Sequence, residues 1–328
     1  MTLMLNASTL ESLLDMPSTV EAVDKIFGDL SRQTAAQPTP TTMHVDSADS
    51  RFIVMSAVAA DPAIAAVKLL ADVPSNADRT LPTQRSMIVL ADHLTGAPLA
   101  MLDGRVPTKM RTAAATAVAT RHLARRDSKV LGLVGAGNLA VAHVEALSCV
   151  MDVQRVVVWS RTEARIEQFK KAVARFDVDV VSVPELEEVF TQSDVVCTLT
   201  PSVEPIIKGE WFREGMHINA VGARPRPTER EIDSQGMARA KVFVDHLGTA
   251  QSKSGEYLMA LAEGAIGENS IAGELGAVVA GALPGRGHEN DITLFNSVGI
   301  GALDLAIGSI ALERAVKRGL GVELDLSL

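Results

Sequence analysis

The sequence has few aromatic residues, few cysteines and no long uncharged apolar run, and each shortage excludes a class of protein. Aromatic residues make up only 3% of the 328 residues, so there is little material for a surface that stacks on nucleic-acid bases. Two cysteines, Cys149 and Cys197, cannot form a disulfide framework for this length. We expect both to be buried, reduced thiols because apolar residues flank them. No segment approaches the roughly 18 uncharged apolar residues that cross a bilayer.

Clusters of basic residues are also missing. The 40 acidic residues outnumber the 31 lysines and arginines, giving a net charge of -9, and no segment is dominated by cations. Nucleic acid and anionic membranes are therefore poor partners. The opening residues, MTLMLNASTLESLLDM, lack the basic start of a secretory signal, and we expect a cytoplasmic protein. The seven histidines show neither H-E-x-x-H nor Cys/His ligand spacing, so we predict no metal site.

Alanine, valine, leucine and glycine are abundant, and their pattern predicts an α/β fold of two domains. Alternating strands and turns over residues 51–102, with a hairpin turn at Thr95-Gly96, follow a helical stretch at 9–35 and precede an alanine-rich helix at 108–123. Further strands are predicted at 130–134, 156–159, 178–183, 195–198 and 217–221, and further helices at 140–150, 163–176, 184–191 and 300–318. Such alternation is typical of a doubly wound parallel sheet. We place that domain at residues 125–301, and a mixed α+β domain at 1–124 and 302–328.

The strongest local signal is a glycine-rich loop that directly follows the strand at 130–134. The run Gly135-Ala136-Gly137-Asn138-Leu139-Ala140 has the spacing G-x-G-x-x-A. Gly135 can make the tight turn, Gly137 removes a side chain where a pyrophosphate approaches the backbone, and Ala140 allows close packing of helix on strand. The helix start then offers free N–H groups to the phosphates. A tight turn without a ligand has the same glycines, but a second strand ending at Trp159 provides the context of a dinucleotide site.

The end of that second strand bears on which dinucleotide binds. A carboxylate there would bond the ribose 2′-hydroxyl and repel a 2′-phosphate, but this chain has Ser160-Arg161-Thr162. Two hydroxyls flanking a guanidinium suit a phosphate. We therefore favour NADP(H), with NAD(H) as the alternative; an arginine that simply faces solvent would give the same sequence.

Two cationic residues lie in unusual surroundings. Arg111 lies in the first turns of the alanine-rich helix, where small neighbours leave space for a ligand and the guanidinium can bind a carboxylate in a fork. The alternative is a surface arginine paired with a neighbouring acid. Lys68 lies inside the apolar run AAVKLL, so it is either buried with a function or reaches solvent from an edge strand.

Four stretches carry a resemblance to a known family. DGRVPTKMRTAAATAVATRHLA, VGAGNLA, EPIIKGEWFREGMHINAVGARPRP and DITLFNSVGIGALDLA occur with the order and spacing of the ornithine cyclodeaminase and mu-crystallin family, which the chain resembles over nearly its whole length. The resemblance implies a homodimer with a substrate-binding and dimerisation domain, made from the N-terminal part and the C-terminal helix, and a Rossmann domain. It also implies an NAD(P)-dependent oxidoreductase that moves a hydride between nicotinamide C4 and the α-carbon of a small amino or imino acid.

The resemblance also implies roles for single residues. Arg111 corresponds to the arginine that holds the substrate carboxylate, Lys68 to the lysine beside the reacting carbon, and Arg51 to a further carboxylate-binding arginine. Lys68 would then bind the carboxylate or the nitrogen, or exchange a proton with the nitrogen. Together, the cofactor-binding residues that we predict are Thr112, Gly135, Ala136, Gly137, Asn138, Leu139, Ser160, Arg161, Thr162, Thr198, Val221, Ser297, Val298 and Gly299.

Three positions depart from the family pattern. Leu139 and Asn296 replace residues that are often Gln and Lys, and Arg224 stands where ornithine cyclodeaminases have an aspartate that acts on the substrate's side-chain amine. A guanidinium would repel an ammonium, which argues against ornithine cyclisation and favours reduction of an imino acid.

Several substrates and roles stay open. A cyclic imine such as pyrroline-2-carboxylate, giving proline, is our first expectation. Arg224 and Arg226 would suit a second carboxylate, as in iminosuccinate, or form a solvated loop; iminopropionate is a further linear substrate. The alternatives are an ornithine cyclodeaminase forming proline and ammonia, and a catalytically silent, nucleotide-binding protein like the crystallins.

Overall fold

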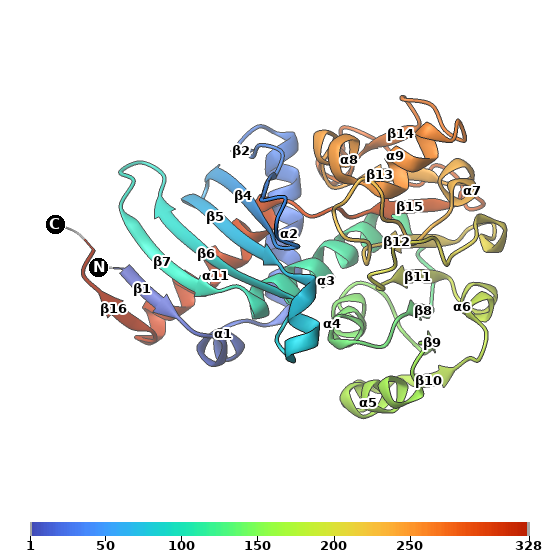
Figure 1. Ribbon diagram of the computed structural model, residues 1–328, viewed down its shortest axis with the longest axis horizontal. Coiled ribbons are helices and arrows are strands. Elements are labelled where there is room, and N and C mark those ends of the chain that lie inside the picture. The colour runs from blue at the N-terminus through green and yellow to red at the C-terminus, as the bar shows by residue number, and fades with distance from the viewer. Residues whose placement is uncertain (1, 327–328) are drawn as a thin grey trace. The chain divides into compact units, whose positions relative to one another are not determined.

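The computed structural model describes residues 2–326, and the chain divides into two compact units (Figure 1). The first unit comprises the residues up to 112 and those from 300 onward, and the second unit comprises residues 113–299. The division falls inside helix α3 (Arg105–Leu123) rather than after it. Thr120 accepts a hydrogen bond from the Asn219 amide at 3.1 Å, which fastens the second half of α3 into the second unit.

The first unit contains a mostly antiparallel sheet of eight strands in the order β16-β1-β7-β6-β5-β4-β2, with β3 paired to β4. The strands are β1 (Thr2–Leu5), β2 (Ala35–Ala36), β3 (Thr41–His44), β4 (Arg51–Ala60), β5 (Ala63–Asp72), β6 (Gln84–Asp92), β7 (Pro98–Asp103) and β16 (Val322–Leu324). Helices α1 (Ala7–Leu13), α2 (Met16–Ser31) and α11 (Gly301–Arg318) complete it, with the 3-10 turn η1 (Pro74–Arg79). The predicted hairpin at Thr95-Gly96 is confirmed, since it joins β6 to β7.

Helix and strand positions in this unit follow from local chemistry. The helical stretch expected at 9–35 is two helices, because the Asp15 side chain accepts a hydrogen bond from Ser18 N at 2.9 Å and starts α2 there, with Pro17 in its first turn. In β4 every second side chain from Ile53 to Ala59 is buried, and α11 packs against β4, β5 and α2. The sheet therefore has one face covered by α11.

The second unit is a doubly wound sheet in which all strands are parallel, in the order β10-β9-β8-β11-β12-β15-β13-β14. The strands are β8 (Val130–Val134), β9 (Arg155–Trp159), β10 (Asp179–Ser182), β11 (Val195–Thr198), β12 (His217–Ala220), β13 (Lys241–Val244), β14 (Ile271–Glu274) and β15 (Thr293–Asn296). Its further helices are α4 (Asn138–Leu147), α5 (Glu163–Val173), α6 (Leu186–Gln192), α7 (Ser234–Arg239), α8 (Leu247–Lys253), α9 (Gly255–Ala262), α10 (Leu275–Val279) and the 3-10 turn η2 (Gly209–Trp211). The predicted fold class is confirmed.

The order of the strands reverses at β8, which has β9 on one side and β11 on the other. In open parallel sheets ligands bind at such a switch point, outside the carboxyl ends of the strands. The predicted glycine loop follows β8 and therefore lies at this switch point. Strands β13, β14 and β15 were not predicted from the sequence. They are as short as β11 and β12, which were predicted, but they lie among glycine-rich loops.

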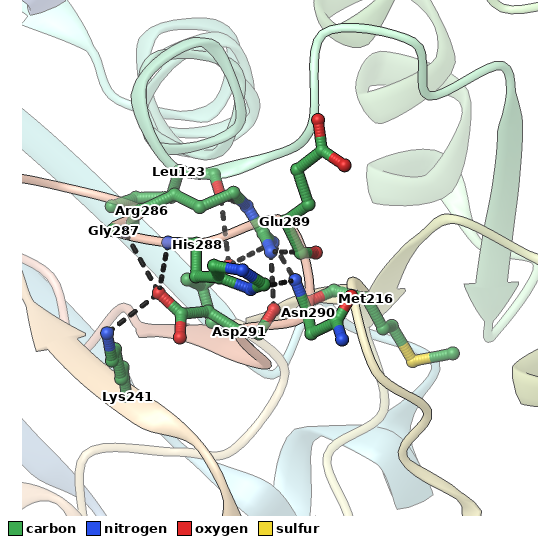
Figure 2. A network of polar contacts seen from close by, with 10 residues as sticks. Leu123, Met216, Lys241, Arg286, Gly287, His288, Glu289, Asn290 and Asp291 are labelled. Carbon is green, nitrogen blue, oxygen red and sulfur yellow. Dashed lines mark hydrogen bonds and ion pairs between the residues drawn. The ribbon is translucent and has the colours of Figure 1, made fainter.

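At the amino ends of β12 and β15, one arginine joins three segments (Figure 2). Arg286 Nε donates to the Leu123 carbonyl at 2.8 Å, and its terminal nitrogens donate to the carbonyls of Glu289, Asp291 and Met216 and to Thr293 Oγ1. All five N–H groups of the guanidinium are thus used. These hydrogen bonds hold this edge of the sheet together. They leave Arg286 no N–H group with which to bind a ligand.

One expectation about the cysteines is wrong. Cys197 is buried in β11, but Cys149 is exposed. Helix α4 ends at Leu147, so Cys149 lies in the turn beyond it although its sequence neighbours are apolar. No helix within residues 2–326 combines the length and apolarity needed to cross a membrane, and no three His, Cys, Asp or Glu side chains of that part are grouped to hold a metal ion.

Candidate active site

In the first unit a lysine is buried beside a carboxylate. Lys68 lies on the face of β5 that α11 covers, opposite Met55 of β4 and Ile88 of β6, and it is fully buried. Its Nζ lies 2.7 Å from Oδ2 of Asp304 on α11. The pKa of Lys68 is lowered to about 8, first because burial penalises the ammonium and then because Arg111 repels it, while Asp304 acts in the opposite direction.

Arg111 reaches the same carboxylate from α3. It is buried, and its Nε lies 3.5 Å from Asp304 Oδ1. The structure therefore brings the two predicted residues Lys68 and Arg111 together, through a third residue that was not predicted from the sequence. Asp304 is a lone carboxylate in the apolar stretch GALDLAIGSIAL, and a buried charge in such a stretch needs a partner. The same reasoning that singled out Lys68 could have found it.

This cluster, which we call the Lys68 centre (Lys68, Arg111 and Asp304), carries two cations and one anion. Lys68 Nζ, Arg111 Nε and both Asp304 carboxylate oxygens are buried, and within residues 2–326 none makes a well-aligned hydrogen bond. An ammonium carries three donors and a guanidinium five. The centre thus has excess positive charge and unused donors, an arrangement suited to a carboxylate ligand.

Two other residues predicted to contact substrate or cofactor, Arg51 and Thr112, lie on β4 and α3 of the first unit. Arg51 begins β4 on the same face of the sheet, but roughly 14 Å of strand separates it from Met55, the residue opposite Lys68. Thr112 follows Arg111 in α3 and donates its hydroxyl hydrogen to the Thr108 carbonyl at 2.7 Å. The backbone of Arg51 is therefore not beside Lys68, and the Thr112 hydroxyl is bonded within its own helix.

The glycine loop of the second unit has the geometry of a phosphate site. Gly135 has a φ of +112°, which favours glycine, and its N donates to the Trp159 carbonyl at 2.8 Å. A Cβ added at Gly137 would have no heavy atom within 4 Å, and no side chain caps the first N–H groups of α4. Gly137 and Asn138 are exposed, whereas Ala136 is buried and Leu139 is half-buried. The loop therefore fits a dinucleotide pyrophosphate.

The predicted ribose-contacting residues follow β9. Ser160 is half-buried, whereas Arg161 and Thr162 are exposed. Thr162 begins α5 without a side-chain cap, and Arg161 forms no ion pair within the described part of the chain. The exposed guanidinium is thus accessible to an anionic ligand.

A buried carboxylate joins the carboxyl ends of β11 and β12. Glu231 accepts hydrogen bonds from Thr198 Oγ1 at 2.6 Å, from Thr200 N and Oγ1 at 2.7 and 2.6 Å, and from Gly222 N at 2.9 Å. Burial raises the pKa of Glu231 to about 7, and these hydrogen bonds act in the opposite direction. Thr198, predicted to contact the cofactor, is thus held by a residue that was not identified from the sequence.

The loop after β15 lies beside these strand ends. Ser297 N donates to the Ala220 carbonyl at 2.9 Å, and Gly299 N donates to Asp245 Oδ2 at 2.6 Å. Asn296 Oδ1 accepts from Ser254 Oγ at 2.6 Å. Because β12 and β15 are neighbours, the predicted cofactor residues Val221, Ser297, Val298 and Gly299 lie at one edge of the sheet.

The two arginines after β12 share one carboxylate. Arg224 Nε lies 2.7 Å from Glu229 Oε2, and Arg226 Nη1 lies 2.9 Å from Glu229 Oε1. Arg224 also lines a small cavity with Ser297 and Val298. From the sequence these arginines were either receptors for a second carboxylate or part of a solvated loop, and the structure gives both an internal partner instead.

Comparisons with known proteins agree on a family. The profile of the ornithine cyclodeaminase/mu-crystallin family matches residues 1–319. The ketimine reductase mu-crystallin of Mus musculus is 35% identical over 274 residues, which cover 84% of this chain and 83% of that protein.

Solved structures show the same likeness. The Δ1-pyrroline-2-carboxylate reductase of Thermococcus litoralis, solved with NADH and L-proline, is 33% identical, with a TM-score of 0.93 over 98% of this chain and 100% of that one. An archaeal alanine dehydrogenase dimer with bound NAD is 31% identical, with a TM-score of 0.94 over 99% of each chain. The chain therefore belongs to the ornithine cyclodeaminase/mu-crystallin family.

Proposed function

We propose that this protein is an NAD(P)H-dependent reductase of small 2-imino acids, with pyrroline-2-carboxylate as the first candidate substrate and proline as its product. The observation that carries the proposal is the Lys68 centre, where two buried cations face one anion. Its excess charge suits the carboxylate of an imino acid. The relative from Thermococcus litoralis, which carries the name of this activity, was solved with NADH and L-proline.

The chain's own residues would bind and orient the substrate. Arg111 contacts Asp304 through Nε, so the outer edge of its guanidinium can bind the substrate carboxylate in a bidentate fork. A bound reduced nicotinamide supplies the hydride that the imine carbon accepts. Gly135, Gly137 and the start of α4 would hold the pyrophosphate of that cofactor. Burial of the Lys68 centre excludes water, which strengthens each of these charge interactions.

Lys68 would control the proton on the substrate nitrogen. An imine carbon accepts a hydride more readily when its nitrogen is protonated, and the pKa of Lys68 is lowered to about 8. A group with a pKa near the working pH exchanges protons efficiently. Asp304 would keep Lys68 oriented and favour its charged form, because it lies 2.7 Å from Nζ.

The direct test is an NADPH and NADH oxidation assay with a panel of substrates. The panel comprises pyrroline-2-carboxylate, piperideine-2-carboxylate, pyruvate with ammonia or methylamine, and oxaloacetate with ammonia. We expect oxidation with at least one imine, and loss of that activity in Arg111→Met through a raised KM. Tight cofactor binding without turnover of any substrate would instead indicate a protein that only binds the nucleotide.

Ornithine cyclisation is the alternative reaction, and the cluster after β12 opposes it. Arg224 stands in this cluster, where a cyclodeaminase needs a carboxylate to receive the side-chain ammonium of ornithine, and a guanidinium repels an ammonium. We expect no ammonia release from ornithine with a catalytic amount of NAD. Ammonia release without net NADH formation would support the cyclodeaminase instead.

For the cofactor, we propose a preference for NADP(H), supported by the exposed Arg161, which forms no ion pair with the residues that the structure describes. The NADH and NAD complexes of the two solved relatives make NAD(H) the alternative. The ratio of kcat/KM values for NADPH and NADH decides between them. A ratio below one would overturn this preference without affecting the proposed reaction.

We also propose a homodimer joined through the first unit. Phe52, Val67 and Met87, which point away from the face covered by α11, are 39%, 44% and 47% exposed. Neighbouring strands that expose large apolar side chains indicate an interaction surface, and the archaeal relative is named as a dimer. Light scattering should give twice the mass of one 34.7 kDa chain, and Val67→Lys should lower it.

A further inference from the structure

Three loops meet at the strand ends where the second unit reverses its strand order. Residues 198–200, which we call the 198–200 segment, leave β11, and Gly222 lies just beyond β12. A Cβ added at Gly222 would lie only 2.2 Å from Thr200 N, and one added at Gly135 of the glycine loop would lie 3.2 Å from the Leu199 carbonyl oxygen. The 198–200 segment is therefore packed between the glycine loop and the end of β12, and its position sets the shape of this edge.

One carboxylate fixes this segment in place. Glu231 is completely buried. Its Oε1 accepts from Thr200 N and Oγ1 at 2.7 and 2.6 Å, and its Oε2 accepts from Thr198 Oγ1 and Gly222 N at 2.6 and 2.9 Å. A carboxylate has about four acceptor positions, and all of them are used. Glu231 can therefore act on a ligand only through the loops that it joins.

A second buried carboxylate holds Glu231 in turn. Glu231 N donates to Glu256 Oε1 at 3.1 Å. Ser254 Oγ lies 3.4 Å from Glu256 Oε2 and donates to Asn296 Oδ1 at 2.6 Å, and Asn296 is the last residue of β15. The polar network thus extends from the end of β15 to the end of β11, and it fixes the backbone of Glu231 as well as its side chain.

The groups that Glu231 joins adjoin the residues predicted to contact the cofactor. Thr198 is one of these residues, and Val221, which directly precedes Gly222, donates its N–H to the Thr198 carbonyl at 3.2 Å. Gly135, against which the 198–200 segment packs, belongs to the predicted pyrophosphate loop. Parallel sheets bind ligands beside the switch point, at the carboxyl ends of the strands. A shift of this segment would therefore change the surface that the dinucleotide meets.

We propose that Glu231 is a positioning residue for the dinucleotide, because its carboxylate joins the ends of β11 and β12 and so keeps the loops around the glycine loop in the arrangement that binds the cofactor. The inference rests on the proposed function, concerns the cofactor half of the site, and lies wholly within the second unit. Loops that are already ordered bind a ligand more tightly, since binding then has less backbone to order.

The test is Glu231→Gln, because a glutamine amide cannot satisfy both loops. Each carboxylate oxygen accepts from one backbone N–H, Oε1 from Thr200 and Oε2 from Gly222, so in either orientation the amide NH2 faces one of them. NADH and NADPH are titrated into the purified full-length protein, and binding is followed by nucleotide fluorescence. The Kd of the nucleotide that the wild type binds more tightly should rise about tenfold, because one buried N–H loses its acceptor and its loop moves.

Asp194→Ala is the matched control at the opposite ends of the same strands. Asp194 directly precedes β11, and its Oδ2 accepts from Lys129 N and Val130 N at 2.9 and 3.0 Å. Its loss should lower the midpoint of urea denaturation and leave the nucleotide Kd within about twofold of wild type, since these donors lie away from the loops. A Kd raised as much as in Glu231→Gln would show that any loosening of the sheet weakens binding, which overturns the proposal.

Kinetics and a milder variant add two further readouts. In imine reduction Glu231→Gln should raise the KM for the nucleotide and leave kcat at saturating nucleotide within about threefold of wild type, because Glu231 contacts no reacting atom. A lowered kcat with an unchanged Kd overturns the positioning role. If Glu231→Gln does not fold, Thr200→Val removes one of the four hydrogen bonds and should raise the Kd about threefold. An unchanged Kd in that variant also overturns the proposal.

The binding assay needs no substrate, so the two proposals can fail separately. If the wild type binds a nucleotide but reduces none of the imines, the proposed reaction fails, and a raised Kd in Glu231→Gln still supports the positioning role. If the wild type reduces an imine and the Kd of the folded Glu231→Gln variant stays within about twofold of wild type, only the role of Glu231 is overturned.

Discussion

Buried charges are arranged differently in the two units. In the first unit, Lys68 Nζ, Arg111 Nε and the Asp304 oxygens are buried without well-aligned hydrogen bonds. In the second unit, Arg286 uses all five N–H groups (Figure 2) and Glu231 accepts four hydrogen bonds. Buried polar groups in proteins are nearly always bonded. Arg286 and Glu231 therefore stabilise the chain, whereas the Lys68 centre, where three such groups lie together, is the candidate ligand site, and four variants test this distinction.

The largest effect should come from Lys68→Met, which removes a charge from the unsaturated cluster. We expect kcat for imine reduction to fall about 1,000-fold, within the range of general acid–base catalysis, because the proton source is lost. Steady-state kinetics with pyrroline-2-carboxylate measure this. Lys25→Met, which removes a surface lysine paired with Asp29, is the control and should keep full activity. An unchanged kcat with a raised KM would make Lys68 a binding residue only.

Arg286→Gln should produce the opposite result, a loss of stability without a loss of catalysis. It removes hydrogen bonds to several carbonyls, including one of the two that each of the buried Leu123 and Met216 carbonyls accepts, at a cost of about 3 kcal/mol in the free energy of unfolding. Urea denaturation followed by circular dichroism measures the change. The folded variant should keep kcat within about twofold of wild type. Normal stability together with weakened NADH binding would show that a full set of hydrogen bonds does not distinguish a stabilising charged group from a ligand-binding one.

Asp304→Asn should change the pH dependence more than the fold of the centre. In the wild type kcat/KM should fall above about pH 8, because the pKa of Lys68 is about 8 and the charged form is required. Asp304 raises that pKa, so its loss should move the decline to lower pH. If the decline moves by one pH unit, kcat/KM at alkaline pH falls about tenfold. Measured pH profiles of kcat/KM check this, and a decline at the same pH in both proteins would assign it to the substrate imine.

Arg161→Ala should have the smallest effect, because this charge is exposed and neither saturated nor buried. We expect the NADPH to NADH ratio of kcat/KM to fall about fivefold, as the charge-assisted hydrogen bond to a 2′-phosphate is lost in a solvent-exposed position. Cofactor-dependent kinetics at fixed substrate measure it. A KM for NADPH that does not rise would show that Arg161 does not contact the phosphate.

Those parts of the molecule that depend on local pattern could be predicted from the sequence. The parallel strands β8 and β11 were predicted with their observed bounds, since continuous apolar runs between helices define them. Lys68 and Arg111 were found because a cation among apolar or small residues is conspicuous. Glu231 was missed, because it lies among the charged residues TEREID, which are typical of a surface loop. Only the path of that loop across the strand ends buries it.

The sharing of Glu229 between Arg224 and Arg226 was equally beyond the sequence. Ion pairs within a loop depend on how the backbone turns, and no periodicity fixes that turn. The exposed position of Cys149 was missed for a related reason, since it follows from where α4 ends.

Helix α11 has a consequence for how the protein is made on the ribosome. Residues 113–299 form a continuous unit, whereas the first unit needs residues on both sides of it in the sequence. During synthesis from the N-terminus, the second unit can therefore complete its fold while the first sheet still lacks the helix that covers it. Asp304 on α11 contacts Lys68 only after this helix has emerged from the ribosome. The Lys68 centre is therefore assembled after the second unit has folded.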